Sequence, residues 1–199
     1  SLKAEGSPGR ACRIITLIPD SLLTDQTEEI LPVEQGSIQP LPEGDTAKLC
    51  VIERHRGTGN VGVGFVSGFG FTEGAVASTV AHDSHNIITL GYEDCLMLRA
   101  VELLEQNGGG LAAVTDEAEL CIPFEIGGLM STLQAEELIR RAADLEHLTR
   151  TMGFEHDPLP ILSFLALPVI PSLKLTDKGL VDVTTFNIVS LQESPSRPD

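Results

Sequence analysis

Five consecutive residues near the middle of the chain carry two imidazoles, a carboxylate, a hydroxyl and an amide. They are His82, Asp83, Ser84, His85 and Asn86. Such groups can bind a metal ion, transfer protons or hydrogen-bond a polar ligand. Asp, Ser and Asn are also ordinary turn residues that bond their own backbone, so a purely structural turn remains the alternative.

The neighbouring residues indicate how this cluster is held. Apolar, β-prone stretches at 75–81 and 87–90 flank it, which predicts two strands joined by a polar turn that presents all five side chains together. A further strand is expected at 47–55, and its exit carries a second polar cluster of Glu53, Arg54 and His55.

Several kinds of chemistry can be tested against these residues. His82 and His85 could ligate a metal with Asp83 or His55, although histidines three apart in a turn are common by chance. Ser84, His85 and Asp83 cannot line up as a catalytic triad, because triad members converge from different elements. The zinc-deaminase signature and the HExxH motif are both absent from the sequence.

The stretch GTGNVG at 57–62 matches the glycine pattern that binds dinucleotide phosphates. We reject that interpretation, because the pattern requires a helix and the glycine-rich continuation VGFVSGFG favours a strand instead. Val61, Val63 and Phe65 alternate with glycines, which predicts one apolar face and one bare face. Another backbone or a ligand can lie closely against the bare face.

Composition limits the possible partners. The chain has 199 residues, 42% of them hydrophobic, and its 29 acidic and 13 basic residues give a net charge of -16. That charge argues against nucleic acid or an anionic membrane surface as a partner. The four widely spaced cysteines contain no Cys-x-x-Cys pair, and reduced thiols in the cytoplasm are the expectation. No apolar run is long enough to span a bilayer.

The order of the expected elements indicates the fold class. A strand at 12–18, the strands above, a core-facing helix at 94–107 capped by Asp94, and strands at 111–114 and 120–124 are expected. A helix beginning with a capping box at Ser131 and Gln134 follows. We predict an α+β layered fold with a mixed, mostly antiparallel sheet and two main helices.

Other segments are expected to be less regular. Residues 19–47, with their prolines, suit an extended strap across the surface, and the proline-bracketed run 161–167 suits a buried strand. Residues 174–179 should form a turn before a final strand at 181–191. We predict a flexible arm or cloning remnant at 1–11, one domain at 12–191 and a disordered tail at 192–199.

Several long motifs in the right order resemble the C-terminal domain of bacterial adenine deaminase, of the amidohydrolase superfamily. They cover roughly residues 12–183. The motifs are VIERHRGTGN at 51–60, GFVSGFG at 64–70, ASTVAHDSHN at 77–86, GGLMS at 127–131 and LSFLALPVIP at 162–171.

The resemblance implies hydrolysis of adenine to hypoxanthine and ammonia in purine salvage, with iron, manganese or zinc activating water. The metal-binding barrel of that family takes about 250 residues and is missing here. We therefore expect this chain to bind no cofactor, to be inactive alone and to have its own barrel as partner. By position, the two polar clusters at 53–55 and 82–86 become substrate-shaping or domain-docking groups.

Two alternatives from other classes remain. The chain could be a stand-alone module whose His82, Asp83 and His85 bind a metal or another ligand. It could instead be an assembly domain whose glycine-rich strand and proline-rich strap serve only oligomer contacts. We expect the chain to form a homo-oligomer.

Overall fold

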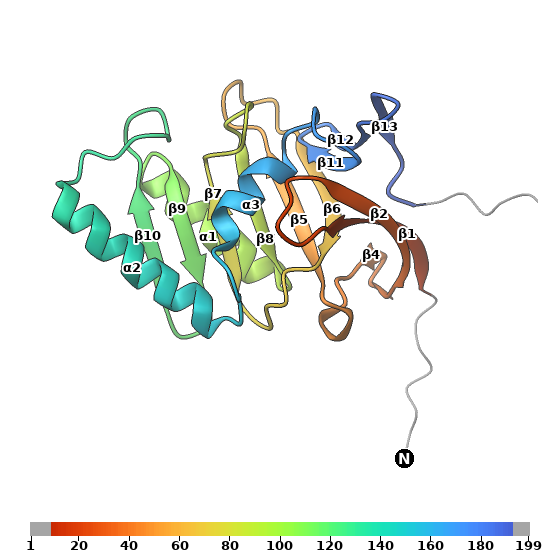
Figure 1. Ribbon diagram of the computed structural model, residues 1–199, viewed down its shortest axis with the longest axis horizontal. Coiled ribbons are helices and arrows are strands. Elements are labelled where there is room, and N and C mark those ends of the chain that lie inside the picture. The colour runs from red at the N-terminus through yellow and green to blue at the C-terminus, as the bar shows by residue number, and fades with distance from the viewer. Residues whose placement is uncertain (1–8, 193–199) are drawn as a thin grey trace, which may run out of the picture.

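A computed structural model describes residues 9–192, which form a three-layered α+β domain around an eight-stranded sheet (Figure 1). The strands lie in the order β10-β9-β7-β8-β5-β6-β1-β2, and within this range β1 and β6 are the parallel pair. The predicted mixed, mostly antiparallel sheet is confirmed. The strands are β1 (Arg10–Leu17), β2 (Thr24–Leu31), β5 (Thr46–Ile52), β6 (Val61–Ser67), β7 (Ala75–Ser78), β8 (Ile87–Gly91), β9 (Gly110–Val114) and β10 (Glu119–Pro123).

Helices and a small sheet cover the two faces. Helix α1 packs on β7, β8 and β9 from one side, and α2, α3 and the sheet β11-β12-β13 cover the other (Figure 1). The remaining elements are α1 (Asp94–Gln106), α2 (Ala135–Thr151), α3 (Pro158–Leu165), β11 (Leu173–Thr176), β12 (Gly179–Asp182), β13 (Asn187–Val189), β3 (Val33–Glu34), β4 (Ser37–Ile38) and a 3-10 helix at Pro42–Gly44.

The alternation of side chains along a strand divides the core between the layers. In β7, Ala75 and Ala77 pack under α1, while Val76 faces α2, α3 and the small sheet. Small alanines on the first face let α1 approach the sheet closely. The central strands are therefore apolar on both faces, as their uninterrupted hydrophobic sequences require.

The bare face of β6 receives the β11-β12 hairpin. A Cβ atom at Gly62 would lie 1.8 Å from the carbonyl oxygen of Thr176, so only glycine allows this approach. A Cβ atom at Gly64 would lie 3.3 Å from the side chain of Leu175, a tight contact that a small shift of this side chain would relieve. The prediction that another backbone lies on this face is confirmed.

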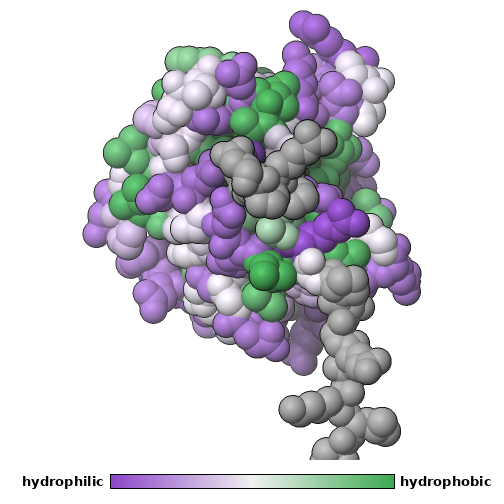
Figure 2. Space-filling view, turned by 90° about the vertical axis from the view of Figure 1, so that its right-hand side faces the viewer, coloured by the Kyte–Doolittle hydropathy of each residue, from purple (hydrophilic) through white to green (hydrophobic). Residues whose placement is uncertain are grey.

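The expectation of an irregular strap at 19–47 is wrong. Residues Thr24–Leu31 pair with β1 over its full length, from Arg10 opposite Leu31 to Leu17 opposite Thr24. The sequence of β2 is polar because the strand lies at the sheet edge and most of its side chains are exposed. Acidic residues on such an edge discourage pairing with other chains. Figure 2 shows the side of the molecule where β1 and β2 lie, with hydrophilic residues interspersed among hydrophobic ones.

The prediction of a strand at 161–167 is also wrong, because residues 161–165 lie in helix α3. The Asp157 carboxylate accepts a hydrogen bond from the Leu159 N–H at 3.0 Å and caps the helix. Pro158 and Pro160 stand in the first turn, where no backbone N–H is needed. The prolines therefore start a helix rather than bracket a strand. Likewise the predicted turn at 174–179 is partly β11, and the final strand at 181–191 is divided into β12 and β13.

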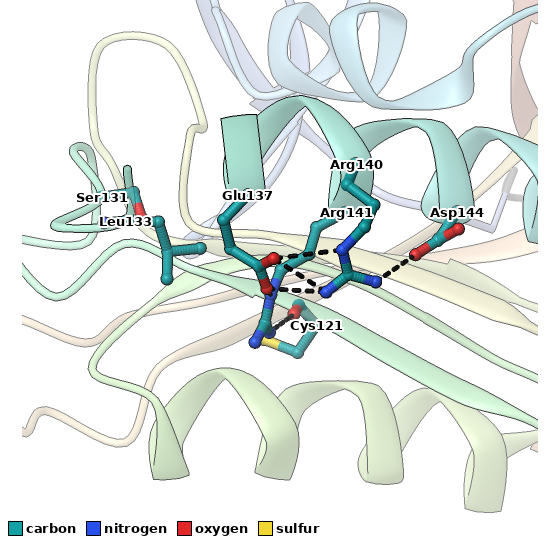
Figure 3. Close-up of polar contacts among 7 residues, drawn as sticks. All are labelled: Cys121, Ser131, Leu133, Glu137, Arg140, Arg141 and Asp144. Atoms are coloured by element: carbon teal, nitrogen blue, oxygen red, sulfur yellow. Dashed lines mark hydrogen bonds and ion pairs between the residues drawn. The ribbon is translucent and has the colours of Figure 1, made fainter. Parts of the chain in front are cut away.

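Both long helices are confirmed, but their predicted caps are not. Asp94 does not cap α1 because its carboxylate binds Lys48 Nζ at 2.5 Å. Ser131 lies outside α2, which begins after Gln134, and its hydroxyl accepts from the Leu133 N–H (Figure 3).

Helix α2 is fixed to β10 through a charged network. The Glu137 carboxylate accepts hydrogen bonds from Arg141, at 2.7 Å, and from Arg140, and both contacts lower its pKa (Figure 3). Arg141 also donates to the carbonyl of Cys121 on β10, at 3.4 Å. The expected N-terminal arm lies mostly outside the described residues, as does all but Gln192 of the expected tail.

Candidate functional site

Strand register brings both polar clusters to one edge of the sheet. Ile52 at the end of β5 pairs with both Val61 and Ile87, at the starts of β6 and β8. Farther along the sheet, Gly110 at the start of β9 pairs with Pro123 at the end of β10. The loops that leave these strand ends lie along the upper edge of the sheet in Figure 1.

The segment 82–86, called the polar loop below, is closed by main-chain contacts. The His85 N–H donates to the Ala81 carbonyl at 2.6 Å, and the His82 N–H donates to the carbonyl of Ser163 in α3 at 3.0 Å. The Ser84 hydroxyl accepts from the Asn86 N–H at 3.4 Å, as expected of a turn. The structural interpretation of these residues is therefore correct for part of the loop.

Arg54 and His55 hold the same loop from the side. Arg54 Nε donates to the His85 carbonyl at 2.6 Å, and Nη2 donates to the Gly127 carbonyl at 2.8 Å. His55 Nε2 lies 2.9 Å from the Ser84 carbonyl and 3.1 Å from the His85 carbonyl. Because carbonyl oxygens only accept, this imidazole nitrogen is the donor.

Glu53 organises the turn that follows β5. Its carboxylate accepts from the N–H and the hydroxyl of Thr58, each at 3.0 Å, and from the N–H groups of Arg56 and His55. The bond from the Thr58 N–H, followed by those from Arg56 and His55, lowers the pKa of Glu53 to about 2. Glu53 is thus ionised and already saturated with donors.

Asn86 joins the polar loop to the small sheet. Its amide is buried and donates to the Asp177 carboxylate at 3.4 Å, while Asn60 donates to the other oxygen at 3.3 Å. Asp177 lies in the turn between β11 and β12. The prediction that all five loop side chains are presented together is wrong here, because Asn86 points inward at the start of β8.

The polar groups that reach solvent are fewer. The His82 side chain is 49% exposed and that of Asp83 is 82% exposed, with 3.6 Å between His82 Nε2 and Asp83 Oδ1. Ser84 is also exposed, whereas His85 is half-buried and its Nδ1 has no partner in the described residues. Asp83 and Ser84 border a hollow of about 320 Å³, lined also by residues 166–169, Thr176 and Asp177.

A larger hollow of about 530 Å³ lies on the α1 face of the sheet. Val61, Val63 and Leu98 give it an apolar lining, and its Lys48 and Asp94 already pair with each other. Size alone would favour it as a binding site. The chemistry favours instead the edge of the sheet that carries the polar loop, called the loop edge, where exposed carboxylate, hydroxyl and imidazole groups meet.

The structure adds residues that sequence reasoning did not single out. Gly127 and Gly128 contact Arg54, and the Thr79 hydroxyl fixes the Gly128 carbonyl at 2.6 Å. The motif GGLMS contained the two glycines, but nothing in it indicated their contact with Arg54. No local pattern indicated Asp177, which is 91 residues away from Asn86 along the chain.

The described residues do not fit a metal ion. Within 9–192 no group of three His, Cys, Asp or Glu side chains is placed to hold one. His55 Nε2 carries a proton, and the His85 ring is half-buried. The hypothesis of a stand-alone metal site at His82, Asp83 and His85 therefore has no geometric support. All four cysteines are free thiols.

Comparison with known sequences decides the family. The sequence profile of the adenine deaminase C-terminal domain matches residues 21–187. The chain belongs to the adenine deaminase C-terminal domain family. It is 49% identical over 183 residues to the adenine deaminase of Desulfatibacillum aliphaticivorans, which covers 91% of this chain but 32% of that relative. It is 48% identical over 191 residues to adenine deaminase 2 of Carboxydothermus hydrogenoformans, covering 94% of this chain and 33% of the relative.

The match identifies a domain rather than a whole enzyme. The adenine deaminase of Listeria monocytogenes is 45% identical over 185 residues, with 90% of this chain and 32% of the relative covered. The chain thus spans about a third of the length of the relatives it matches. Among the described residues of this adenine deaminase C-terminal domain, no helix is both long and apolar enough to cross a membrane.

Proposed function

We propose that this chain is the C-terminal domain of a polypeptide that hydrolyses adenine to hypoxanthine and ammonia. The observation that carries the proposal is the 49% identity to an adenine deaminase over 91% of the chain. In this arrangement a barrel elsewhere in the polypeptide holds the iron, manganese or zinc, since residues 9–192 contain no group of three side chains placed to hold a metal. The domain contributes its loop edge to the mouth of the barrel.

The side chains at this edge suit a purine. Adenine presents an amino group that donates hydrogen bonds and ring nitrogens that accept them. The Asp83 carboxylate can accept from the amino group or a ring N–H, while the Ser84 hydroxyl hydrogen can be donated to a ring nitrogen. His82, whose ring centroid lies 5.3 Å from that of Phe164, offers a further polar edge. These groups would bind and orient the base, and the hydrolytic chemistry takes place at the metal.

An exposed apolar tip beside these groups supports docking of the barrel. Ile126, Leu129 and Met130 are all exposed and lie in a tight loop closed by the Ile126 N–H and the Met130 carbonyl, at 3.1 Å. Arg54 connects this loop, residues 126–130 and called the glycine loop below, to the polar loop. Exposed apolar residues next to conformationally fixed polar groups are typical of an interface between domains.

The test uses the complete polypeptide that contains this chain. Ammonia release from adenine should be rapid with metal bound, and Asp83→Asn should lower kcat/KM by about one to three orders of magnitude, roughly 1.4 to 4 kcal/mol of transition-state binding. Metal content and thermal midpoint should be unchanged. Asp116→Asn is the matched control, since Asp116 is exposed in the β9–β10 turn at the opposite end of the sheet. If Asp83→Asn deaminates adenine as fast as wild type, the polar loop is not part of the substrate site.

A further inference from the structure

We propose that Arg54 is a positioning residue that holds the polar loop in register with the glycine loop, so that His82, Asp83 and Ser84 face outward. The inference rests on the proposed function, because the outward side chains matter only if a ligand meets this edge. It assigns different roles to the two polar clusters: the first holds main chain, and the second presents side chains.

The contacts of Arg54 support a bridging role. Its guanidinium donates to two main-chain carbonyls that lie 31 and 73 residues away, one in each loop. Arg is suited to this task because its planar fork of donors can serve two acceptors at once, which a Lys ammonium does less well. Both bonds have a charged donor, and such bonds are stronger than those between neutral groups.

The glycine loop is a firm anchor for this bridge. The Gly128 carbonyl accepts from Thr79, which is buried and also bonds the main chain of Gly110. Close packing restricts movement further, because a Cβ atom at Gly109 would lie 2.5 Å from the Gly128 Cα. The glycine loop is thus held in place by contacts that do not involve Arg54.

Gly128 leaves room for the guanidinium. A Cβ atom there would lie 2.6 Å from Arg54 Nη2 and 3.0 Å from Cζ, while Gly127 has open space around its corresponding position. Both glycines have positive φ, +75° and +65° respectively, so alanine costs similar backbone strain at either one. Comparing alanine substitutions at Gly128 and Gly127 therefore distinguishes displacement of Arg54 from backbone strain in the glycine loop.

The consequence for the polar loop follows from its own contacts. The bonds from Arg54 and His55 go to carbonyls of His85 and Ser84, and none of them involves the side chains of His82 or Asp83. His85 itself has a positive φ of 51°, an uncommon conformation for a residue with a side chain. External bonds to its carbonyl help to maintain that conformation and hence the direction of the preceding side chains.

The experiment measures amide hydrogen exchange in the chain itself, which needs no enzymatic activity. In Arg54→Met the hydrogen-bonded amides of the polar loop, those of His82, His85 and Asn86, should exchange about tenfold faster or more, while the strands of the sheet keep their protection. Arg54→Lys should restore part of the protection. Arg56→Met is the matched control, because Arg56 is an exposed neighbour in the same turn. Unchanged exchange of the polar loop in Arg54→Met would overturn the proposal.

A second comparison remains informative if Arg54→Met does not fold. Gly128→Ala should accelerate exchange in the polar loop, whereas Gly127→Ala should affect only its own loop. In an Arg54→Met variant that folds, no guanidinium remains to be displaced. Adding Gly128→Ala to that variant should therefore accelerate exchange in the polar loop no more than adding Gly127→Ala does. Equal effects of the two alanines in the presence of Arg54 would contradict the bridging role.

Kinetics of the complete polypeptide separate this inference from the proposed function. Arg54→Met should lower kcat/KM for adenine about tenfold to a hundredfold with metal content unchanged, and Arg54→Lys should recover part of it. If the polypeptide does not deaminate adenine but exchange responds as expected, the proposed function fails and the positioning role stands. If adenine is deaminated equally by wild type and Arg54→Met, the positioning role fails.

Discussion

Replacing Gly62 by alanine tests how the small sheet lies on the large one. The added Cβ atom would lie 1.8 Å from the Thr176 carbonyl oxygen, and that of Gly64→Ala would lie 3.3 Å from a Leu175 methyl group. A carbon and a carbonyl oxygen normally approach no closer than about 3.3 Å, so the hairpin must move by about 1.5 Å. Side-chain rotation cannot relieve this clash, because both partners are parts of the main chain or fixed to it.

The two variants should therefore differ strongly in stability. Inserting a methyl group into a packed core costs about 1 to 3 kcal/mol, and we expect Gly62→Ala to reach at least about 3 kcal/mol because lifting the hairpin also loosens the buried Leu175 and Leu180. For a chain of this size that lowers the thermal midpoint by about 6 to 12 °C. Gly64→Ala should stay within about 1 kcal/mol of wild type, since the Leu175 methyl can shift and alanine reduces the entropy of the unfolded chain.

Urea unfolding followed by circular dichroism, with thermal melts beside it, measures both variants under the same conditions. The expected result is a clear loss of stability for Gly62→Ala, up to failure to fold, and a near-neutral Gly64→Ala. Equal midpoints for the two variants would show that the β11-β12 hairpin does not approach β6 at Gly62.

Two further outcomes can be checked on the same chain. Lys174 is fully buried and donates to the Leu22 carbonyl, and burial lowers its pKa to about 8. The unfolded chain binds the proton up to about pH 10.4, so the free energy of unfolding of wild type relative to Lys174→Met should rise from pH 8 to pH 10; parallel pH profiles would refute this. The exposed apolar residues Ile126, Leu129 and Met130 should cause weak self-association of the isolated chain. Met130→Gln should reduce this association, whereas Ile139→Gln, on an exposed part of α2, should not. Sedimentation velocity at increasing concentration measures the association, and a chain that stays monomeric throughout would contradict the prediction.

The sequence predicted those elements whose own side chains carry the periodic signal. Helices α1 and α2 have regular apolar positions, and β6 alternates glycine with apolar residues. Strand β2 escaped prediction because its stability comes from eight pairs with β1 rather than from its own apolar residues. Helix α3 is harder to predict because prolines on both sides of an apolar run are also typical of strand boundaries, while the decisive group is the Asp157 carboxylate that caps the first turn.

The candidate site, too, could be predicted only in part from the sequence. The residues 53–55 and 82–86 could be chosen from their types, and strand register does place them side by side. The separate roles of these residues could not be predicted from the sequence, because the roles depend on partners that are distant along the chain. Gly127 is such a partner for Arg54, and Asp177 is one for Asn86. Side-chain chemistry alone does not say whether a polar group points toward a ligand or holds a neighbouring loop.

We propose that this domain shapes the substrate site, while the metal and the hydrolytic step belong to another part of the polypeptide. The decisive experiment measures ammonia release from adenine for the isolated chain and for the complete polypeptide, with iron or manganese supplied to both. We expect turnover by the complete polypeptide and none above buffer by the isolated chain. Ammonia release by the isolated chain that a chelator abolishes would contradict this proposal.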